Sequence, residues 1–193
     1  MLEKFHVAQK DIVYVDEKRL RTVTKEILMT QDISEKDAIL ATDALIRADL
    51  RGVESHGVSN MLRAYLGAFK SNSLNPKPNW NIVKETPSCA TINSDNGLGI
   101  VVAPQAMEIA VEKAKKTGAG IVTMNNCGHL GMLAYHSMIA SDNDMIGTTM
   151  AACSPRMVPT YSSVRALGTN PISYSAPADK LPDFVFDAAM TSV

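Results

Sequence analysis

The hydrophobic pattern of this chain changes its period between residues 71 and 79, and this change limits the folds open to it. Up to Phe69, apolar residues recur every three or four positions, as on one face of a helix. The segment SNSLNPKPN, residues 71–79, then interrupts the pattern. Beyond it, short apolar runs alternate with helical stretches, which is typical of a sheet with flanking helices. We therefore expect a mixed α/β fold, with N-terminal helices over residues 1–75 and a mixed sheet with flanking helices over residues 76–193.

The helical region carries clear start signals. Asp16 is expected to cap one helix, whose apolar face is formed by Leu20, Val23, Ile27 and Leu28. Ser34 is expected to cap the next, with Asp37 at its third position and Gly52 just beyond its end. The apolar stripe of this second helix is Ala38, Ile39, Ala41, Leu45, Ile46 and Ala48. A third helix is expected from near Ser59, with an apolar face of Met61, Leu62, Tyr65, Leu66 and Phe69.

The remaining chain predicts strands separated by two helices. Strands are expected at residues 80–85, 89–94, 120–124, 145–152, 172–177 and 183–189. Helices are expected at about residues 104–117, with Pro104 in the first turn, and at residues 131–142. The polar residues NNCG, 125–128, are expected to form a loop between the strand at 120–124 and the helix at 131–142.

Composition and charge exclude several classes of partner. The 193 residues carry a net charge of −1 and show no cluster of Lys or Arg, so neither nucleic acid nor an anionic membrane is expected to bind. No apolar run approaches the ~18 residues that a membrane span requires. The three cysteines, Cys89, Cys127 and Cys153, are odd in number and far apart. They predict a reducing compartment, the cytoplasm, and argue against a disulfide framework or a cysteine-built zinc site.

The segment GLGIVV, residues 97–102, is not a dinucleotide-binding fingerprint. Val102 stands where the third glycine would be needed, and no acidic residue follows at the end of a second strand. We expect Gly97 and Gly99 to serve in turns. The chain also contains no P-loop and no HExxH motif.

Two histidines stand in loops where they could do chemistry. His56 follows Ser55 just past the second predicted helix, where a contact with the helix dipole or the backbone explains it as well as proton transfer does. No GxSxG motif surrounds Ser55, so a hydrolase nucleophile is not expected there. His129 lies between a predicted strand and a helix start near Gly131, where α/β proteins often bind ligands. A packed or helix-capping histidine explains His129 equally well.

The other histidines receive structural interpretations or none. His136 is expected to pack within a helix, and His6, near the N-terminus, is assigned no role. A metal site built from His129 and His136 is disfavoured, because no carboxylate lies at ligand spacing, and no metal is expected. The GTNP segment around Thr169 and Asn170 is by itself explained as a structural turn.

Five segments, in this order, resemble the malate/L-lactate dehydrogenase family of nicotinamide-dependent oxidoreductases. They are DALIRADLRGVESHGVSN, AMEIAVEKAKKTGAGIVTMNN, GHLGMLAYHS, LGTNPISYSAP and FDAAMTS. The family includes ureidoglycolate dehydrogenase and the Δ1-piperideine-2-carboxylate reductases, and it is distinct from the Rossmann-type lactate and malate dehydrogenases. The resemblance implies a non-Rossmann fold that binds NAD or NADP, in keeping with the rejected fingerprint.

The resemblance also implies roles for particular residues. Ser55, His56 and His129 would lie in the active site, with His129 preferred over His56 as the proton donor or acceptor. Thr169 would contact the substrate. The residues that would contact the cofactor are Leu130, Gly131, Met132, Leu133, Ala134, Asn170, Asp187, Ala188 and Ala189.

Two features depart from the family pattern. Family members commonly carry an arginine four residues after the SHG histidine, where it pairs with the substrate carboxylate, and Asn60 stands there in this chain. Arg63, one helical turn further on, is the alternative contact, although a bidentate site is sensitive to such a shift. Family chains also run well past the segment that corresponds to Asp187–Ala189. We therefore expect the fold to be truncated at the C-terminus and its NAD(P)-binding domain, residues 76–193, to be incomplete.

The function expected from the resemblance is hydride transfer between NAD(P) and a malate- or lactate-like 2-hydroxy or 2-oxo acid. A histidine, with an unperturbed pKa of ~6.5, suits the accompanying proton transfer in both directions. A homodimer is expected. The alternative is a catalytically inactive N-terminal fragment or binding remnant of such an enzyme.

Overall fold

The computed structural model describes residues 8–191, and its contacts divide the chain into two compact units. Unit 1 contains the chain up to Asn81, together with Ser94–Val102 and Asn126–Gly131. Unit 2 contains Ile82–Asn93, Ala103–Asn125 and the chain from Met132 onward. The units therefore interleave along the sequence, and the expected division at residue 75 stays a prediction. His6 lies outside the described residues.

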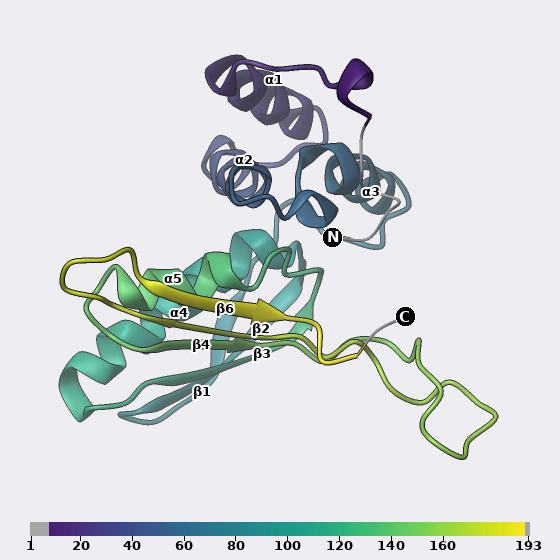
Figure 1. Cartoon of the computed structure of the whole chain (residues 1–193). Helices are drawn as coiled ribbons and strands as arrows, with labels where there is room; N and C mark the ends of the chain where they lie inside the picture. Colours follow the sequence, from purple (N-terminus) through teal and green to yellow (C-terminus); the bar gives the residue numbers. More distant parts are fainter. Residues whose placement is uncertain (1–7, 192–193) are drawn as a thin grey trace. The chain divides into compact units, whose positions relative to one another are not determined.

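Helices and strands follow one another in the order drawn in Figure 1. The α-helices are α1 (Glu17–Met29), α2 (Glu35–Leu50), α3 (Val58–Lys70), α4 (Gly99–Thr117) and α5 (Ala134–Ser141). The strands are β1 (Asn81–Glu85), β2 (Cys89–Gly97), β3 (Ile121–Cys127), β4 (Gly147–Met150), β5 (Ile172–Ala176) and β6 (Phe184–Ala188). Short 3-10 helices, η2 (Gln9–Asp11) and η3 (Glu54–His56), precede α1 and α3.

Helices α1 and α2 begin where their capping residues predict. The Asp16 carboxylate accepts a hydrogen bond from the Arg19 N–H at 2.9 Å, and Ser34 Oγ accepts one from the Asp37 N–H at 3.2 Å. Each side chain satisfies an N–H group that the first helical turn leaves without a partner. Beyond α2, Gly52 has a φ of 72°, the left-handed conformation that commonly ends a helix. These two helix starts are therefore confirmed.

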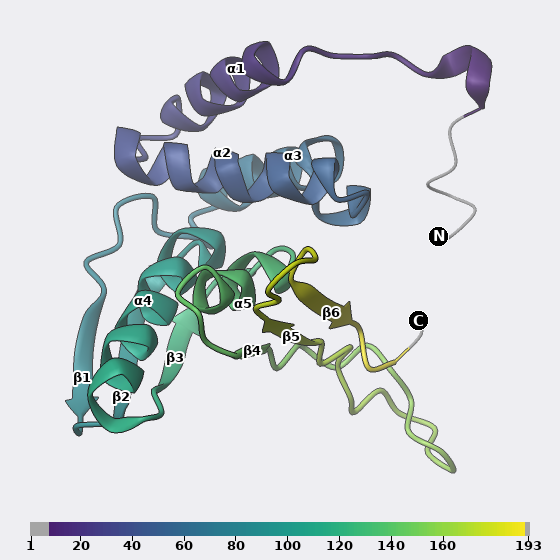
Figure 2. The same cartoon turned by 60° about the vertical axis from the view of Figure 1, so that its left-hand side comes forward.

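The helices of unit 1 pack through an apolar interior that is narrower than the sequence pattern predicts. In Figure 2, α2 and α3 lie side by side with α1 against α2. Leu28, Leu45 and Ile46 are each at most 1% exposed. Val23 and Ile39, which were expected on the same apolar faces, are 49% and 52% exposed. Both residues lie at the margins of the stripes, where no neighbouring helix covers a long side chain.

The strands form two three-stranded sheets rather than the single mixed sheet that we expected. Their orders are β1–β2–β3 and β4–β5–β6. The second sheet is antiparallel throughout, with Thr148 opposite Tyr174 and Tyr174 opposite Phe186. The mixed α/β architecture itself is confirmed, with helices first and strands and helices intermixed after them.

Serine side chains join α5 to one face of the β4–β5–β6 sheet. Ser173 and Ser175 are fully buried on this face. Ser173 Oγ lies 2.8 Å from the Oγ of Ser137 in α5, and Ser175 Oγ donates to the Ser137 carbonyl. Hydroxyls buried in this way satisfy one another's hydrogen-bonding capacity. The opposite face is apolar, with the exposed rings of Tyr174 and Phe186 6.4 Å apart.

Several element boundaries differ from the sequence-based expectation, among them those of α4, β3 and α5. Helix α4 begins at Gly99 rather than near Pro104, because the buried run Leu98–Val102 already forms its first turn. Pro104 therefore lies inside the helix, in its second turn, where its missing N–H removes one helical hydrogen bond. Strand β3 continues to Cys127, so most of the expected NNCG loop is strand. Polar residues fit there because β3 is an edge strand, whose side chains meet solvent. Helix α5 begins at Ala134.

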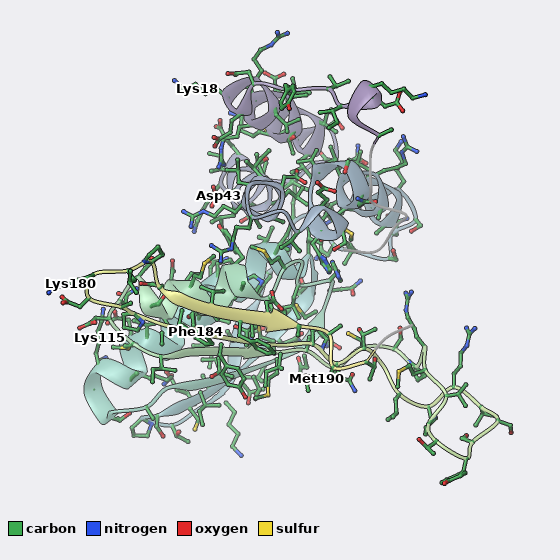
Figure 3. The ribbon with its side chains drawn as sticks, viewed as in Figure 1. Lys18, Asp43, Lys115, Lys180, Phe184 and Met190 are labelled. Atoms are coloured by element: carbon green, nitrogen blue, oxygen red, sulfur yellow. The ribbon has the colours of Figure 1, made fainter. Side chains whose placement is uncertain are left out.

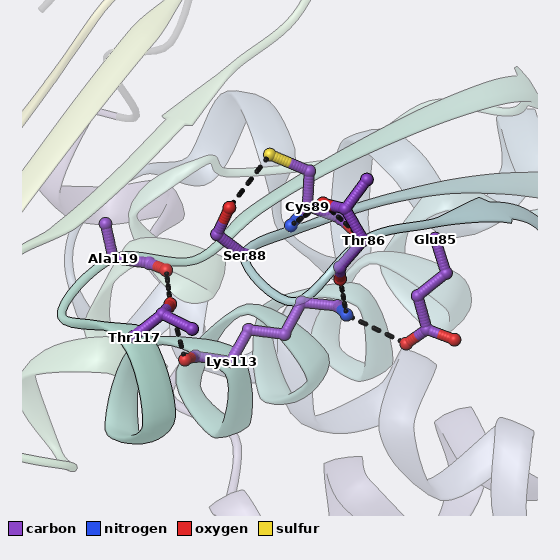
Figure 4. A network of polar contacts seen from close by, with 7 residues as sticks. All are labelled: Glu85, Thr86, Ser88, Cys89, Lys113, Thr117 and Ala119. Carbon is purple, nitrogen blue, oxygen red and sulfur yellow. Dashed lines mark hydrogen bonds and ion pairs between the residues drawn. The ribbon is translucent and has the colours of Figure 1, made fainter.

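Lys113 in α4 is a buried ammonium group held by two oxygen atoms. Its side chain is 9% exposed, and Nζ lies 2.8 Å from Glu85 Oε1 and 2.7 Å from the Thr86 carbonyl oxygen (Figure 4). Lys115, labelled in Figure 3, pairs with Glu112 but is 46% exposed. The hydrogen bond from Lys113, reinforced by its charge, holds the pKa of Glu85 below its ordinary value.

We expect Lys113→Ala to lower the free energy of unfolding by about 1–3 kcal/mol, because the Thr86 carbonyl loses its donor and the buried stem loses its packing. Lys115→Ala is the matched control and should change it by less than about 0.5 kcal/mol. Urea denaturation of the three proteins checks this.

The decrease in the free energy of unfolding caused by Lys113→Ala should be smaller at acid pH than at neutral pH. Because the folded-state pKa of Glu85 is lowered, its pairing with Lys113 stabilises the fold above the ordinary carboxylate range and is lost as pH falls through the lowered pKa. Equal effects of the two substitutions at neutral pH would contradict the role given to Lys113.

Candidate functional site

A carboxylate from α2 fixes the bend between α2 and α3. Asp49 Oδ2 accepts a hydrogen bond from the Val58 N–H at the start of α3, at 2.9 Å. The N-cap residue of α3 is Gly57, which has no side chain to cap the helix, so Asp49 takes that role. Burial raises the pKa of the Asp49 carboxyl, and the hydrogen bond from Val58 opposes that rise. A Cβ at position 57 would lie 1.6 Å from Asp49 Oδ1, so only glycine fits.

This bend carries the first pair of predicted active-site residues. Ser55 and His56 lie in η3 and are both half-buried. Ser55 Oγ lies 2.8 Å from His56 Nδ1. Because a hydroxyl can donate or accept a hydrogen bond, this contact suits either protonation state of the ring nitrogen.

His129 is placed in unit 1 by a close approach between backbone segments. The Gly128 N–H donates to the Gly97 carbonyl at 2.8 Å. A Cβ on Gly99 would lie 2.4 Å from the Gly128 oxygen and 2.6 Å from the His129 oxygen. The turn role expected for these glycines is therefore wrong: Gly97 ends β2 and Gly99 begins α4. The missing side chain of Gly99 lets the His129 segment come close.

The two loop histidines lie next to each other in unit 1. The His56 and His129 rings are stacked, with centroids 5.5 Å apart and planes inclined by 15°. Tyr65 Oη lies 2.9 Å from His129 Nδ1, and the Gly131 N–H donates to the same nitrogen at 3.3 Å. The structure thus brings together Ser55, His56 and His129, although their catalytic roles stay predictions.

Sequence reasoning missed Tyr65 as a site residue, because it fits the apolar face of α3. Its side chain is 2% exposed, and its hydroxyl reaches His129 across 64 positions of sequence. Burial raises the pKa of the Tyr65 phenol. The available signal was the rule that a buried tyrosine hydroxyl usually finds a polar partner, but the sequence alone could not say which one.

Asn60 and Arg63, the two residues of α3 predicted to contact the substrate, differ in their surroundings. Asn60 Nδ2 donates to the Glu54 carbonyl at 2.7 Å, so the side chain braces η3. Arg63 is exposed to solvent. It lies two positions before Tyr65, and residues at that spacing point to different sides of a helix.

Several predicted cofactor residues meet in unit 2. Asp187 Oδ2 in β6 accepts a hydrogen bond from the Ala134 N–H at the start of α5, at 2.7 Å. The Thr169 carbonyl accepts one from the Met190 N–H at 3.0 Å, and Asn170 Oδ1 accepts one from the Cys153 N–H at 3.1 Å. Three segments far apart in sequence, 133–134, 169–170 and 187–190, are therefore joined by hydrogen bonds.

The predicted cofactor residues differ in their exposure. Met132, Leu133 and Ala134 are buried in unit 2, whereas Asp187 and Ala189 are exposed and Ala188 is half-buried. In unit 1, Leu130 and Gly131 are half-buried. Gly131 has a φ of 67°, and a Cβ there would lie 2.6 Å from Ile100 Cγ2, so this position requires glycine.

Within residues 8–191, no helix is both long and apolar enough to cross a membrane. No group of three or more His, Cys, Asp or Glu side chains in the same range is arranged to hold a metal ion. His136 is 1% exposed within α5, as its structural interpretation predicted.

Comparison with known proteins identifies the family. The family model described as malate/L-lactate dehydrogenase matches residues 15–193. Similar proteins include the malate dehydrogenase of Pyrococcus abyssi, 39% identical over 193 residues, which cover 100% of this chain and 52% of the relative. The L-sulfolactate dehydrogenase of Methanocaldococcus jannaschii is 40% identical over 168 residues, 87% of this chain and 48% of the relative. The chain belongs to the malate/L-lactate dehydrogenase family, as its motifs predicted.

The fold agrees with a solved member. The malate dehydrogenase structure from Pyrococcus horikoshii OT3 superposes with a TM-score of 0.92 at 39% identity, covering 100% of this chain and 55% of that chain. This chain therefore spans about half the length of the relatives that it matches.

The fit between Asp49 and Gly57 generates a stability prediction. We expect Gly57→Ala to lower the free energy of unfolding by about 1–3 kcal/mol, because the added methyl group displaces the Asp49 carboxylate from the Val58 N–H. Gly67→Ala in the same helix is the matched control: its Cβ would meet nothing within 4 Å, so it should raise stability by about 0.5–1 kcal/mol. Thermal and urea unfolding measure both. A stabilising effect at both positions would contradict the capping role of Asp49.

Proposed function

We propose that this chain belongs to an enzyme that transfers a hydride between NAD(P) and C2 of a 2-hydroxy or 2-oxo acid. Family membership supports this proposal, and so do the names of the relatives, which act on malate and on L-sulfolactate. Both are 2-hydroxy acids that differ in the group carried at the far end. The shared part is the carbon that bears the hydroxyl and the carboxylate beside it, and we assign this part to the substrate of the present chain.

The observation that carries the proposal is the stacked pair of His56 and His129. Reduction of a 2-oxo acid needs a proton at the C2 oxygen, and oxidation removes it. Histidine is the side chain whose unperturbed pKa lies nearest to neutral pH. Two imidazole rings 5.5 Å apart, with Ser55 and Tyr65 at their Nδ1 atoms, supply and orient such a group. We therefore propose Ser55, His56 and His129 as the catalytic set.

Substrate contacts are proposed for three residues. Arg63 is exposed and carries the charge that a carboxylate requires, while Asn60 holds η3 and with it Ser55 and His56. Thr169 keeps its side-chain hydroxyl for a ligand while its carbonyl accepts from Met190. Arg63 does not stand at the position where family members commonly carry their arginine. It would therefore hold a substrate carboxylate at a different place, and we expect a substrate of a different size from those of the relatives.

The cofactor contacts are proposed for two groups of residues. In unit 2, Ala188 and Ala189 have small side chains beside the Asp187 carboxylate, and small apolar residues next to a few polar groups suit a flat ring such as nicotinamide. The buried Met132, Leu133 and Ala134 support this surface from within. In unit 1, Leu130 and Gly131 are the proposed contacts. In unit 2, Asn170 is a further proposed contact, because its side chain holds the GTNP turn against the Cys153 N–H. When bound, NAD(P)H supplies the hydride.

We also propose that the protein is a homodimer and acts in the cytoplasm. The family resemblance supports the homodimer. Free Cys89, Cys127 and Cys153 support a reducing compartment.

The test follows nicotinamide absorbance in the presence of the folded 193-residue chain. NADH or NADPH is combined with the 2-oxo acids of malate and sulfolactate, with pyruvate, with 2-oxoglutarate and with a cyclic imine. Oxidation of either cofactor is the expected result and ranks the substrates. No oxidation and no cofactor binding by a folded sample would favour the alternative of an inactive fragment, which the half-length match to relatives supports.

In an active preparation, His56→Ala and His129→Ala should each lower kcat by about 10²–10⁴-fold, because each removes a group that positions or transfers the proton. Lys70→Ala, at the far end of α3, is the control and should leave kcat unchanged. Near-normal turnover of both histidine variants would contradict the catalytic set.

A further inference from the structure

The Nδ1 atom of His129 has a backbone donor as one of its partners. The Gly131 N–H points at this nitrogen from 3.3 Å. A backbone N–H can only donate, so Nδ1 must present its lone pair to it. A protonated Nδ1 would point its own hydrogen at the Gly131 hydrogen, and it could not accept a hydrogen bond from Gly131.

The second partner of the same nitrogen is the Tyr65 hydroxyl at 2.9 Å. A hydroxyl can donate or accept, and donation to Nδ1 is the arrangement compatible with the Gly131 N–H pointing at the same nitrogen. Tyr65 is well suited to remain a donor, since its side chain is 2% exposed and burial raises the pKa of its phenol. The ring of a neutral histidine whose Nδ1 accepts carries its proton on Nε2.

The neighbouring ring of His56 has a partner of a different kind. Ser55 Oγ, 2.8 Å from His56 Nδ1, can accept from a protonated nitrogen or donate to an unprotonated one. Two stacked imidazolium rings 5.5 Å apart would repel each other, so a positive charge is favoured on only one of them. His56 from η3 and Tyr65 from α3 are titratable groups that contact the His129 ring.

We propose that Tyr65 is a positioning residue that, with the Gly131 amide, holds His129 neutral with its proton on Nε2, and that His56 is the ring that gains and loses charge. The catalytic roles given to His56 and His129 rest on the proposed function. The position of the proton on the His129 ring does not. In reduction, a hydride with its electron pair adds to C2, the C–O π pair moves to the oxygen, and a proton from the His56 imidazolium completes the hydroxyl. His129 Nε2–H acts as a hydrogen-bond donor and ends the reaction unchanged. Oxidation reverses each movement.

The test is nitrogen-15 NMR of the histidine side chains in the 193-residue chain, at a pH where the rings are neutral. The chain has four histidines, and the signals of His129 are assigned by their loss in His129→Gln. The expected spectrum shows an unprotonated Nδ1 and a protonated Nε2 for His129. Tyr65→Phe keeps the ring packing and removes only the hydroxyl, so it should shift the Nδ1 signal and populate the Nδ1-protonated form.

Tyr135→Phe is the matched control, since Tyr135 is also a buried tyrosine, 9% exposed, but lies in α5. It should leave the His129 signals unchanged. A proton on Nδ1 of His129 in the unmodified chain would overturn the proposal. So would a Tyr65→Phe spectrum identical to the parent, because Tyr65 would then not position the ring.

Kinetics separate this proposal from the proposed function. In an active preparation, Tyr65→Phe should lower kcat on the order of tenfold with little change in KM, since it alters the reacting arrangement rather than the binding of the substrate. If the NMR result is as expected and no substrate is turned over, the proton placement stands and the proposed function fails.

Discussion

The arrangement around His129 depends on two backbone segments that meet without side chains between them. The Gly128 N–H bonds to the Gly97 carbonyl, and Gly99 begins α4 within contact distance of the Gly128 and His129 oxygens. A methyl group at Gly99 would push the segment 128–131 away from the start of α4. The contacts of His129 with His56 and Tyr65 would then be lost together. The glycines are thus structural conditions for the histidine pair, although they contribute no chemistry themselves.

A second constraint acts on the other half of the pair. His56 is held by a bend whose capping group comes from the preceding helix, through Asp49, and whose interior is braced by the Asn60 amide. The first contact satisfies the Val58 N–H, which the start of α3 leaves without a helical partner. The second adds the Asn60 amide to a Glu54 carbonyl that also accepts from the Gly57 N–H. The departure of Asn60 from the arginine common in the family therefore has a structural role in this chain. Its amide makes an internal contact with the Glu54 carbonyl.

The sequence predicted features that depend on neighbouring residues and missed those that depend on distant ones. The caps at Asp16 and Ser34 are local and were confirmed. The start of α4 was missed because Pro104 is a strong local signal, whereas burial of Leu98–Val102 depends on the rest of the fold. Tyr65 looked like an ordinary core residue because its partner lies 64 positions away. The motif resemblance supplied His56 and His129, but their stacking and the polar partners of each Nδ1 were visible only in the structure.

The sequence separations of these contacts have a consequence for the order of folding. The Asp49–Val58 hydrogen bond closes a loop of nine residues, whereas the Tyr65–His129 contact closes one of 64. Short loops cost less chain entropy to close and form faster. We therefore expect the α2–α3 bend to organise early and the histidine pair to be completed among the last events. Chains emerging from the ribosome would carry His56 well before His129 has been synthesised, so the stacked histidine pair exists only once the middle of the chain has folded.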